Sequence, residues 1–444
     1  MIRWLGVMWL SFLLLVPVPA QEKSQSFFSQ IVEEAPSSRA APSSSSKLAK
    51  FEPERGCYLG AYIDLDPDMK QEFIDQSGKR RRLPEEFESN VGRPHAIYFF
   101  YLGYGQPLPS DWISYLDSRQ KYVHIALEPN GGLEQVVEDD YLRNLAVGLR
   151  MTGARIFIRF ASEMNGPWVR YHGDPKLYRE KFRLVARVMH ELAPNVAMVW
   201  CPYAMPTGPI RDYYPGDDAV DWVGVNLYNV TYFNQDPRTP AHHVEPDHLL
   251  SYVYRTYSAR KPIMIGEYAT THFSALENRY VISFATENIQ RLYRLLPIRF
   301  PRVKAIHYFN SNNLQLAHRV NNDYRVTSDP KVLAAYQSAI SGPYFLSQPQ
   351  SPAMPPSNIK ATPLGDRLEL RTVSRIRADF SPRPQVVARF LLNDQVIPSQ
   401  SSPTGYTTTL FPARLRSGEH KLVFEAFDLM GQTIERRILI VSLP

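Results

Sequence analysis

Short apolar runs recur along residues 51–345, and most of them are separated by amphipathic stretches. Each run has four to seven residues, is largely apolar or aromatic, and is bounded by Gly, Pro or polar residues, which is typical of buried strands. The eight predicted strands are 57–63, 96–101, 122–127, 156–160, 197–200, 220–225, 262–265 and 303–309. Helix-like periodicity covers 140–152, 175–192, 247–258 and 280–295. Strands that alternate with helices predict a parallel sheet, and eight of them predict an α/β fold closed as a (β/α)₈ TIM barrel over 51–345.

A different pattern begins near residue 346. Residues 346–357 are rich in proline and predict a hinge, after which apolar positions recur with period two. Predicted strands at 367–373, 386–392, 406–410, 420–427 and 434–441 indicate a small all-β sandwich over 358–444. The run Ser417–Asp428, followed by Gly431, resembles the last strands of bacterial immunoglobulin-like domains attached to secreted enzymes. The resemblance implies a spacer, with carbohydrate binding as the alternative role.

The first fifty residues predict export rather than a folded domain. Residues 1–20 combine Arg3, an apolar stretch over 4–16 and a small-residue cleavage site at Ala20, which is the pattern of a secretory signal peptide. We therefore expect a secreted protein, extracellular or periplasmic, with retention of the signal as an anchor as the alternative. The apolar stretch is short for a bilayer, so we expect no membrane span in the mature chain. Residues 21–50 are rich in Ser, Ala and Pro and predict a disordered linker.

The composition argues against nucleic-acid and metal sites. The formal net charge of +6 is spread along the chain, and the one basic run, 79–82, is predicted to be a solvated turn, so we expect no nucleic-acid partner. The His-rich segment 242–248 matches no tight ligand spacing, and we expect no metal and no cofactor. Cys57 and Cys201 fall at opposite ends of the predicted barrel, beyond the reach of a disulfide, so both are expected to be unpaired and buried.

Two predicted strands end in a glutamate at the same rim of the barrel. Glu163 follows the strand at 156–160, and Glu267 follows the strand at 262–265. Either residue alone is as consistent with a solvated strand end as with a catalytic role. Two carboxylates at the ends of two parallel strands are, however, what retaining glycoside hydrolysis requires, because one must donate a proton and the other must attack the anomeric carbon.

The segments around both glutamates resemble glycoside hydrolase family 26, a group of (β/α)₈-barrel enzymes that cut β-mannans and, in some members, other β-glycans. The likeness rests on Arg159–Trp168, on Tyr213–Gly224 and on Ile265–Tyr268, and it covers most of the predicted barrel. It implies that Glu163 is the acid/base and that Glu267 is the nucleophile.

Two positions depart from the family pattern. Ser162 stands where most members carry a His, and Tyr308 and Phe309 are the candidates for an aromatic platform that a Trp usually supplies. Both departures touch the subsite that holds the sugar being cleaved, so the choice of polymer stays open.

The remaining site candidates flank the two glutamates. Side chains alternate along a strand, so Arg159 is expected one layer below Glu163, where it would hold carboxylates ionised or pair with another strand's acid. The resemblance implies that Tyr228 donates a hydrogen bond to Glu267, with a plain core tyrosine as the alternative. It also implies that Glu128 lines the substrate cleft, with an ordinary loop acid as the alternative. The predicted substrate-binding residues are Arg159, Asn165, Trp168, Tyr228, Glu128, Asn226 and Tyr308.

Together these features predict a secreted, retaining endo-β-glycosidase that hydrolyses a β-linked polysaccharide, in the first instance a β-mannan, by double displacement. We expect a monomer whose partner is that polysaccharide. The alternative is a catalytically inactive barrel that binds an extracellular polysaccharide. The presence of both carboxylates favours the enzyme.

Overall fold

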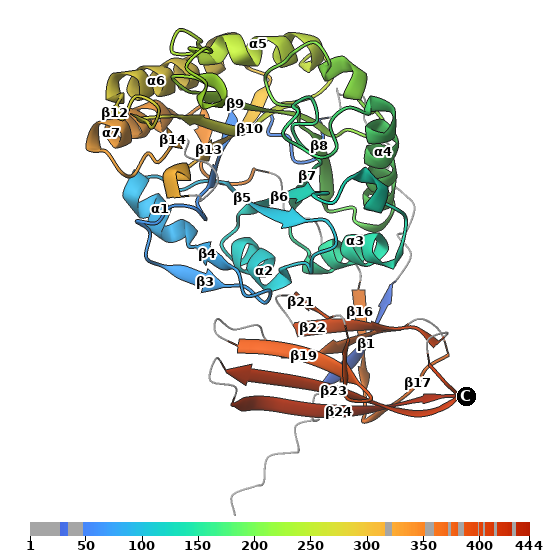
Figure 1. The fold of residues 1–444 in the computed structure, drawn as a ribbon. Coiled ribbons are helices and arrows are strands. Elements are labelled where there is room, and N and C mark those ends of the chain that lie inside the picture. The colour runs from blue at the N-terminus through green and yellow to red at the C-terminus, as the bar shows by residue number, and fades with distance from the viewer. Residues whose placement is uncertain are drawn as a thin grey trace, which may run out of the picture.

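The chain forms a closed barrel and a second, β-rich module (Figure 1). The predicted signal peptide, 1–20, lies outside the residues that the structure describes. Residues 351–358, which include part of the predicted hinge, also lie outside them. The computed structural model describes residues 27–33, 48–315, 322–350, 359–371, 374–380, 386–397, 399–402, 405–412, 415–428 and 432–444.

The barrel is a (β/α)₈ TIM barrel of eight parallel strands. Each strand pairs with its neighbours in chain order, and β13 closes the ring by pairing with β2. A short strand, β15 (Phe345–Leu346), pairs with the start of β2. All eight predicted strands are present, and the largest differences are at β9 and β10, which run on past Val225 and Ile265. The barrel strands are β2 (Cys57–Tyr62), β5 (Ile97–Gly103), β6 (Tyr122–Glu128), β7 (Ile156–Phe160), β8 (Val196–Trp200), β9 (Trp222–Asn229), β10 (Ile263–Thr270) and β13 (Val303–Phe309).

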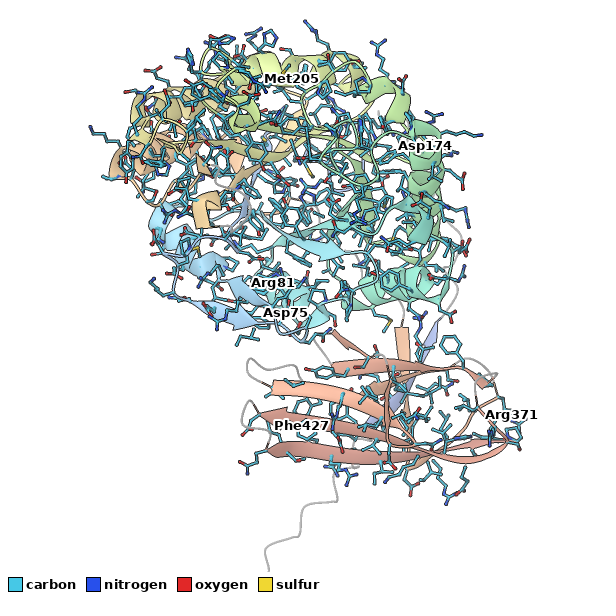
Figure 2. All side chains as sticks on the ribbon, in the orientation of Figure 1. Asp75, Arg81, Asp174, Met205, Arg371 and Phe427 are labelled. Carbon is cyan, nitrogen blue, oxygen red and sulfur yellow. The ribbon has the colours of Figure 1, made fainter. Side chains whose placement is uncertain are left out.

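Helices surround the ring of strands (Figure 1). Three of them begin at an aspartate whose carboxylate accepts a hydrogen bond from a backbone N–H of the first turn: Asp139, Asp174 (Figure 2) and Asp329. Within the described residues, no helix is both long and apolar enough to cross a membrane. The helices are α1 (Pro84–Val91), α2 (Ser110–Ser118), α3 (Asp140–Thr152), α4 (Pro175–Leu192), α5 (Pro246–Tyr257), α6 (Ile282–Arg299) and α7 (Pro330–Ile340).

Alternate side chains of each barrel strand face the interior or the helices. In β7, Phe157 and Arg159 face inward, as the alternation predicted, whereas Ile158 joins the core between strands and helices. Cys57 faces the helices and Cys201 faces the interior. Both cysteines are buried and unpaired, which confirms the prediction.

The predicted basic turn is a strand. Strand β4 (Arg80–Arg82) pairs with β3 (Glu72–Ile74) in a short hairpin. Arg81 is buried, and its guanidinium forms ion pairs with Asp64 at 2.8 Å and Asp75 at 2.9 Å. Arg81 and Asp75 are labelled near each other in Figure 2. The prediction of a solvated turn is therefore wrong, because the two acids stabilise the central arginine inside the fold.

The C-terminal module consists of two five-stranded sheets that share one apolar core. Their strand orders are β16-β1-β18-β22-β21 and β17-β24-β23-β19-β20. The immunoglobulin-like assignment of this module stays a prediction. Its C-terminal strands are β16 (Ile359–Leu364), β17 (Arg367–Glu369), β18 (Ser374–Ala378), β19 (Val386–Leu392), β20 (Gln395–Ile397), β21 (Gln400–Ser402), β22 (Gly405–Leu410), β23 (Gly418–Asp428) and β24 (Thr433–Leu443).

One strand of this module comes from the N-terminal segment. Strand β1 (Phe28–Glu33) lies between β16 and β18 and is antiparallel to both. Phe28 is buried in the core of the module. The expectation that 21–50 form a disordered linker is wrong for 28–33, because the Ser- and Pro-rich composition of the whole segment concealed one short strand-like run.

The module packs against the flank of the barrel that α2 and α3 form (Figure 1). Arg375 on β18 donates a hydrogen bond from Nη1 to Sδ of Met151 on α3, at 3.3 Å. A cavity of about 660 Å³ lies in this interface, lined by the loop before α2, by α3 and by strands of the module. The two bodies therefore touch without packing into one continuous core.

Candidate active site

Glu163 follows β7 in a turn with an unusual backbone. Ala161 and Glu163 have φ angles of 47° and 61°, in the left-handed region that residues with a side chain rarely adopt. The backbone N–H of Glu163 donates to the carbonyl of Cys201, at 2.9 Å, which ties this turn to the end of β8. Strained backbone of this kind costs about 1–3 kcal/mol per residue and is concentrated at functional sites.

A β-bulge at Gly266 determines where Glu267 points. Met264 of β10 faces the barrel interior, so strict alternation would turn Glu267 outward to the helices. The pairing of β10 with β9 skips Gly266, and Glu267 is opposite Asn226. The extra residue reverses the alternation, and Glu267 enters the barrel with 3% of its surface exposed.

Three side chains donate hydrogen bonds to Glu267. Oε1 accepts from Nη2 of Arg159 at 2.5 Å and from the hydroxyl of Tyr101 at 2.5 Å. Oε2 accepts from the hydroxyl of Tyr228, as the resemblance implied. The buried guanidinium and the two phenols all stabilise the ionised carboxylate, which is the form that can attack as a nucleophile.

Glu163 has different neighbours. Its Oε1 accepts from Nδ2 of Asn226 at 2.8 Å, and its Oε2 accepts from Nε1 of Trp168 at 2.6 Å. Burial, and then the charge of Glu267, raises the pKa of Glu163 to about 7. A carboxyl group with this pKa is protonated in a large fraction of molecules near neutral pH, as a general acid must be.

Asn226 connects the two carboxyl groups. Its Nδ2 donates to Glu163, and its Oδ1 accepts from Nη1 of Arg159 at 3.0 Å and from Sγ of Cys201 at 3.2 Å. The same guanidinium then reaches Glu267. Both Arg159 and Asn226 are almost completely buried, so they hold the carboxyl groups in place and do not present a surface to a substrate, which contradicts the prediction that they bind it.

A third carboxyl group lies at the end of β6. Glu128 accepts from the hydroxyl of Ser162 at 2.6 Å and from the hydroxyl of Tyr171 at 2.5 Å. Burial raises the pKa of Glu128, and the charge of Arg159 opposes that shift. Ser162, one of the positions that depart from the pattern of the resembling family, therefore donates its hydroxyl hydrogen to Glu128.

Asn165 is not a substrate-binding residue. It is fully buried, and its Nδ2 donates to the carbonyls of Tyr203 at 2.9 Å and Pro206 at 3.0 Å. Its Oδ1 accepts from the backbone N–H of Tyr203 at 2.9 Å. The side chain therefore fastens the loop that carries Glu163 to the loop after β8, and the prediction for this residue is wrong.

Tyr308 is also misplaced by the sequence prediction. It is fully buried among the helices, with its ring centroid 5.1 Å from that of Tyr336 on α7. The alternation along β13 turns Phe309 inward instead, where its ring stacks on Tyr62 at 4.7 Å. Trp168, in contrast, is 44% exposed and stays a candidate platform for a sugar ring.

Tyr101 donates a hydrogen bond to Glu267 but is not among the site residues predicted from the sequence. It lies near the end of β5, two residues after Phe99, whose ring faces the barrel interior. A hydroxyl-bearing residue on the inward face at the end of a predicted strand was the available signal. It was overlooked because no resemblance named it.

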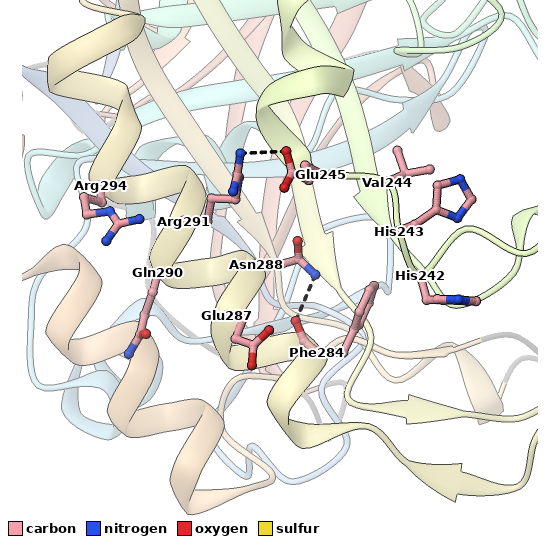
Figure 3. A pocket seen from close by; sticks show the side chains of 10 residues that line it. All are labelled: His242, His243, Val244, Glu245, Phe284, Glu287, Asn288, Gln290, Arg291 and Arg294. Atoms are coloured by element: carbon pink, nitrogen blue, oxygen red, sulfur yellow. Dashed lines mark hydrogen bonds and ion pairs between the residues drawn. The ribbon is translucent and has the colours of Figure 1, made fainter.

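The His-rich segment leads into α5, and the carbonyl of Val244 in it accepts a hydrogen bond from Nδ2 of Asn229 at the end of β9, at 2.8 Å. It lines a pocket of about 410 Å³ between the segment before α5 and helix α6 (Figure 3). In that pocket Arg291 is paired with Glu245 at 2.6 Å (Figure 3). No group of His, Cys, Asp and Glu side chains able to hold a metal ion occurs among the described residues.

Comparisons with known proteins find sequence relatives named for xylan. The chain is 32% identical over 114 residues to β-1,3-xylanase TXYA of Vibrio sp, covering 23% of this chain and 24% of the relative. It is 25% identical over 166 residues to a β-1,3-xylanase of Alcaligenes sp, covering 35% and 32%. The alignments thus span about a quarter to a third of these relatives. No family model matches the chain.

A solved structure aligns over most of the molecule. It is a double mutant of the Cellulomonas fimi endo-β-1,4-mannanase, 13% identical, with a TM-score of 0.45. The alignment covers 88% of this chain and 96% of that chain.

Proposed function

We propose that this protein is a retaining endo-β-glycosidase that hydrolyses a β-linked polysaccharide. The observation that supports this proposal is the opposite environment of the two glutamates. Glu267 accepts hydrogen bonds from a buried guanidinium and two phenols, whereas Glu163 has an amide and an indole for neighbours and a pKa of about 7. A carboxylate that accepts from a guanidinium and two phenols, beside a carboxyl group with a raised pKa, fits the division of labour that double displacement needs.

In the first step, Glu267 attacks the anomeric carbon while Glu163 gives its proton to the departing glycosidic oxygen. The bond to the leaving sugar breaks and a glycosyl-enzyme ester forms on Glu267. In the second step, Glu163, now ionised, takes a proton from water, and the water oxygen attacks the same carbon and releases Glu267. Arg159, Tyr101 and Tyr228 hold the nucleophile in place through both steps.

The substrate is proposed from two separate indications. Two curated relatives are named for β-1,3-xylan and a third is named an endoglucanase, whereas the resemblance around both glutamates points to β-mannan. A reducing-sugar assay across β-1,3-xylan, β-mannan, mixed-linkage β-glucan and bacterial exopolysaccharides selects the polymer. Residues 1–20 support the further proposal that the protein is exported to reach that polymer.

The roles of the glutamates are tested with an aryl glycoside of the sugar that this screen selects. We expect Glu267→Ala to abolish turnover, because the covalent intermediate cannot form. We expect Glu163→Ala to accumulate the glycosyl-enzyme, because an acidic phenol departs without protonation and the second step lacks its base. Added azide, which needs no base, should then restore turnover and yield a β-glycosyl azide.

Two results would contradict the proposal. Rescue of Glu267→Ala by azide to the α-glycosyl azide, with Glu163→Ala inert, would reverse the two assignments. Binding of a polymer by the wild-type protein without any release of reducing ends would show an inactive barrel that binds polysaccharide.

A further inference from the structure

Below the two glutamates, the barrel interior holds a pair of histidines that the proposed reaction does not use. His124 of β6 and His307 of β13 are fully buried, with ring centroids 4.7 Å apart. Nδ1 of His124 lies 3.3 Å from Nε2 of His307. Nδ1 of His307 lies 3.1 Å from the carbonyl oxygen of Ile265. These contacts link β6 and β13 to β10, the strand that carries the nucleophile.

The contacts fix the tautomer of both rings. A carbonyl oxygen can only accept, so Nδ1 of His307 carries a hydrogen. Burial lowers the pKa of His307 to about 3, and burial, His307 and Arg159 hold the pKa of His124 well below its usual range, so both rings are neutral. Nε2 of His307 is then a bare acceptor, and Nδ1–H of His124 donates to it. Nε2 of His124 is left without a hydrogen-bond partner within the described part of the chain.

The carbonyl of Ile265 immediately precedes the bulge that turns Glu267 into the barrel. The regular pairing of β10 breaks directly after Ile265 against both β9 and β13. A bulge disrupts the ladder locally, and a buried carbonyl needs a hydrogen-bond donor. The ring of His307 donates to this carbonyl at the edge of the bulge.

The surroundings are shaped to hold the ring of His307. A Cβ added to Gly60 of β2 would lie 2.3 Å from Cδ2 of His307, so the ring occupies the space that a larger residue would fill. Phe99 of β5 packs edge-on against His307 at 5.6 Å and tilted against His124 at 5.4 Å. The guanidinium of Arg159, the charged group that acts on both histidines, lies 5.2 Å from the centre of the Phe99 ring.

We propose that His307, kept in its Nδ1–H form by His124, is a positioning residue for the nucleophile. Its N–H supports the carbonyl at the bulge and so keeps the carboxylate of Glu267 aimed into the barrel. This inference rests on the proposed function, because it assigns the histidine pair a role in the attack by Glu267.

Two substitutions of His307 separate the hydrogen bond from the bulk of the ring. In His307→Asn the amide nitrogen occupies the place of Nδ1, and in His307→Gln it occupies the place of Nε2. The measurement is the rate at which an activated 2-fluoro glycoside of the selected sugar labels Glu267, followed by mass spectrometry. We expect labelling to slow at least about tenfold in His307→Gln, with KM for the polymer nearly unchanged, because a small misplacement of a reacting group is costly. His307→Asn should label at close to the wild-type rate.

His95→Gln is the matched control. His95 is also fully buried, with Nδ1 3.1 Å from the carbonyl of Arg93 and Nε2 2.8 Å from the hydroxyl of Tyr336, but it lies among the helices. We expect this variant to lower Tm about as much as His307→Gln and to leave labelling unchanged. Wild-type labelling in a folded His307→Gln, or equal slowing in His95→Gln, would overturn the inference.

Labelling of the wild-type protein distinguishes failure of the proposed function from failure of this inference. If the reagent does not label Glu267 in the wild type, the proposed function fails and this inference falls with it. If the His307 variants do not fold, ¹⁵N NMR of the histidine rings in the intact protein decides. We expect both rings as neutral Nδ1–H tautomers from about pH 5 to 9, and an Nε2–H form or an imidazolium at either position overturns the inference.

Discussion

At the scale of single residues, two identical side chains have contrasting environments because of their neighbours. Glu163 and Glu267 share Asn226 and Arg159 in one hydrogen-bonded chain, yet the guanidinium contacts only Glu267. The guanidinium therefore holds the carboxyl group at one end of the chain, and burial together with the charge of that group raises the pKa of Glu163 at the other end. Glu267 thus helps to set the protonation of Glu163.

This coupling predicts the pH dependence of activity. The general acid must be protonated, so we expect kcat/KM on a soluble substrate to fall as the pH rises through about 7, the pKa of Glu163. The indole N–H of Trp168 stabilises the ionised form of Glu163. Trp168→Phe removes that hydrogen bond, raises the pKa and moves the fall to higher pH, by about 0.4 to 1 pH unit for a bond of ordinary strength.

The readout is the pH at which kcat/KM falls, and not the magnitude of kcat/KM, because loss of an exposed indole can also weaken sugar binding. Trp112→Phe is the control, since this buried indole lies on α2, away from both glutamates. It should leave the profile in place. If the fall of kcat/KM stays at the same pH or moves to lower pH in Trp168→Phe, the proposed role of Glu163 as the acid is contradicted.

At the scale of elements, the site depends on one irregular strand. A Cβ at Gly266 would lie 2.7 Å from Oδ1 of Asn226 and 3.0 Å from Nη1 of Arg159. We expect Gly266→Ala to lower kcat at least about tenfold and to destabilise the fold by about 1–3 kcal/mol, because the added methyl group displaces the two side chains that join the glutamates. Gly208→Ala, where a Cβ meets nothing within 4 Å, should change neither quantity. Equal kcat values in the two variants would refute this account of the bulge.

The same irregularity marks the limit of what the sequence predicts. Short apolar runs separated by helical patterns located all eight barrel strands, and alternation placed Arg159 inside the barrel correctly. Alternation alone would have turned Glu267 outward, and only the resemblance supplied its role, because a bulge depends on pairing with strands distant in sequence. For Asn165 the resemblance gave the wrong role. Its place in the motif suggested a contact with the substrate, but its partners are backbone groups of a loop about forty residues away in sequence.

At the scale of the whole molecule, segments that precede and follow the barrel in sequence meet in one module. Strand β1 lies between two strands that follow the barrel in sequence, so the barrel is inserted within the module. Composition did not predict this arrangement, because a six-residue strand is stable only when distant strands flank it. The barrel domain extends to β15, because β15 pairs with the first barrel strand, β2, and the carbonyl of Tyr344 accepts a hydrogen bond from the backbone N–H of Cys57.

This topology predicts that two shortened chains will behave differently. A chain of residues 48–350 should fold and keep most of its activity on a soluble substrate, because the interface with the module contains a large cavity and lies on the outer face of α2 and α3. A chain of residues 48–444 should keep the barrel but leave the module open to protease, since β16 and β18 lose the strand between them and the core loses Phe28. Limited proteolysis with mass spectrometry, together with the activity assay, measures both effects. Insolubility of 48–350 would show that the module completes the core of the barrel, and a protease-resistant module in 48–444 would show that β1 contributes little to its stability.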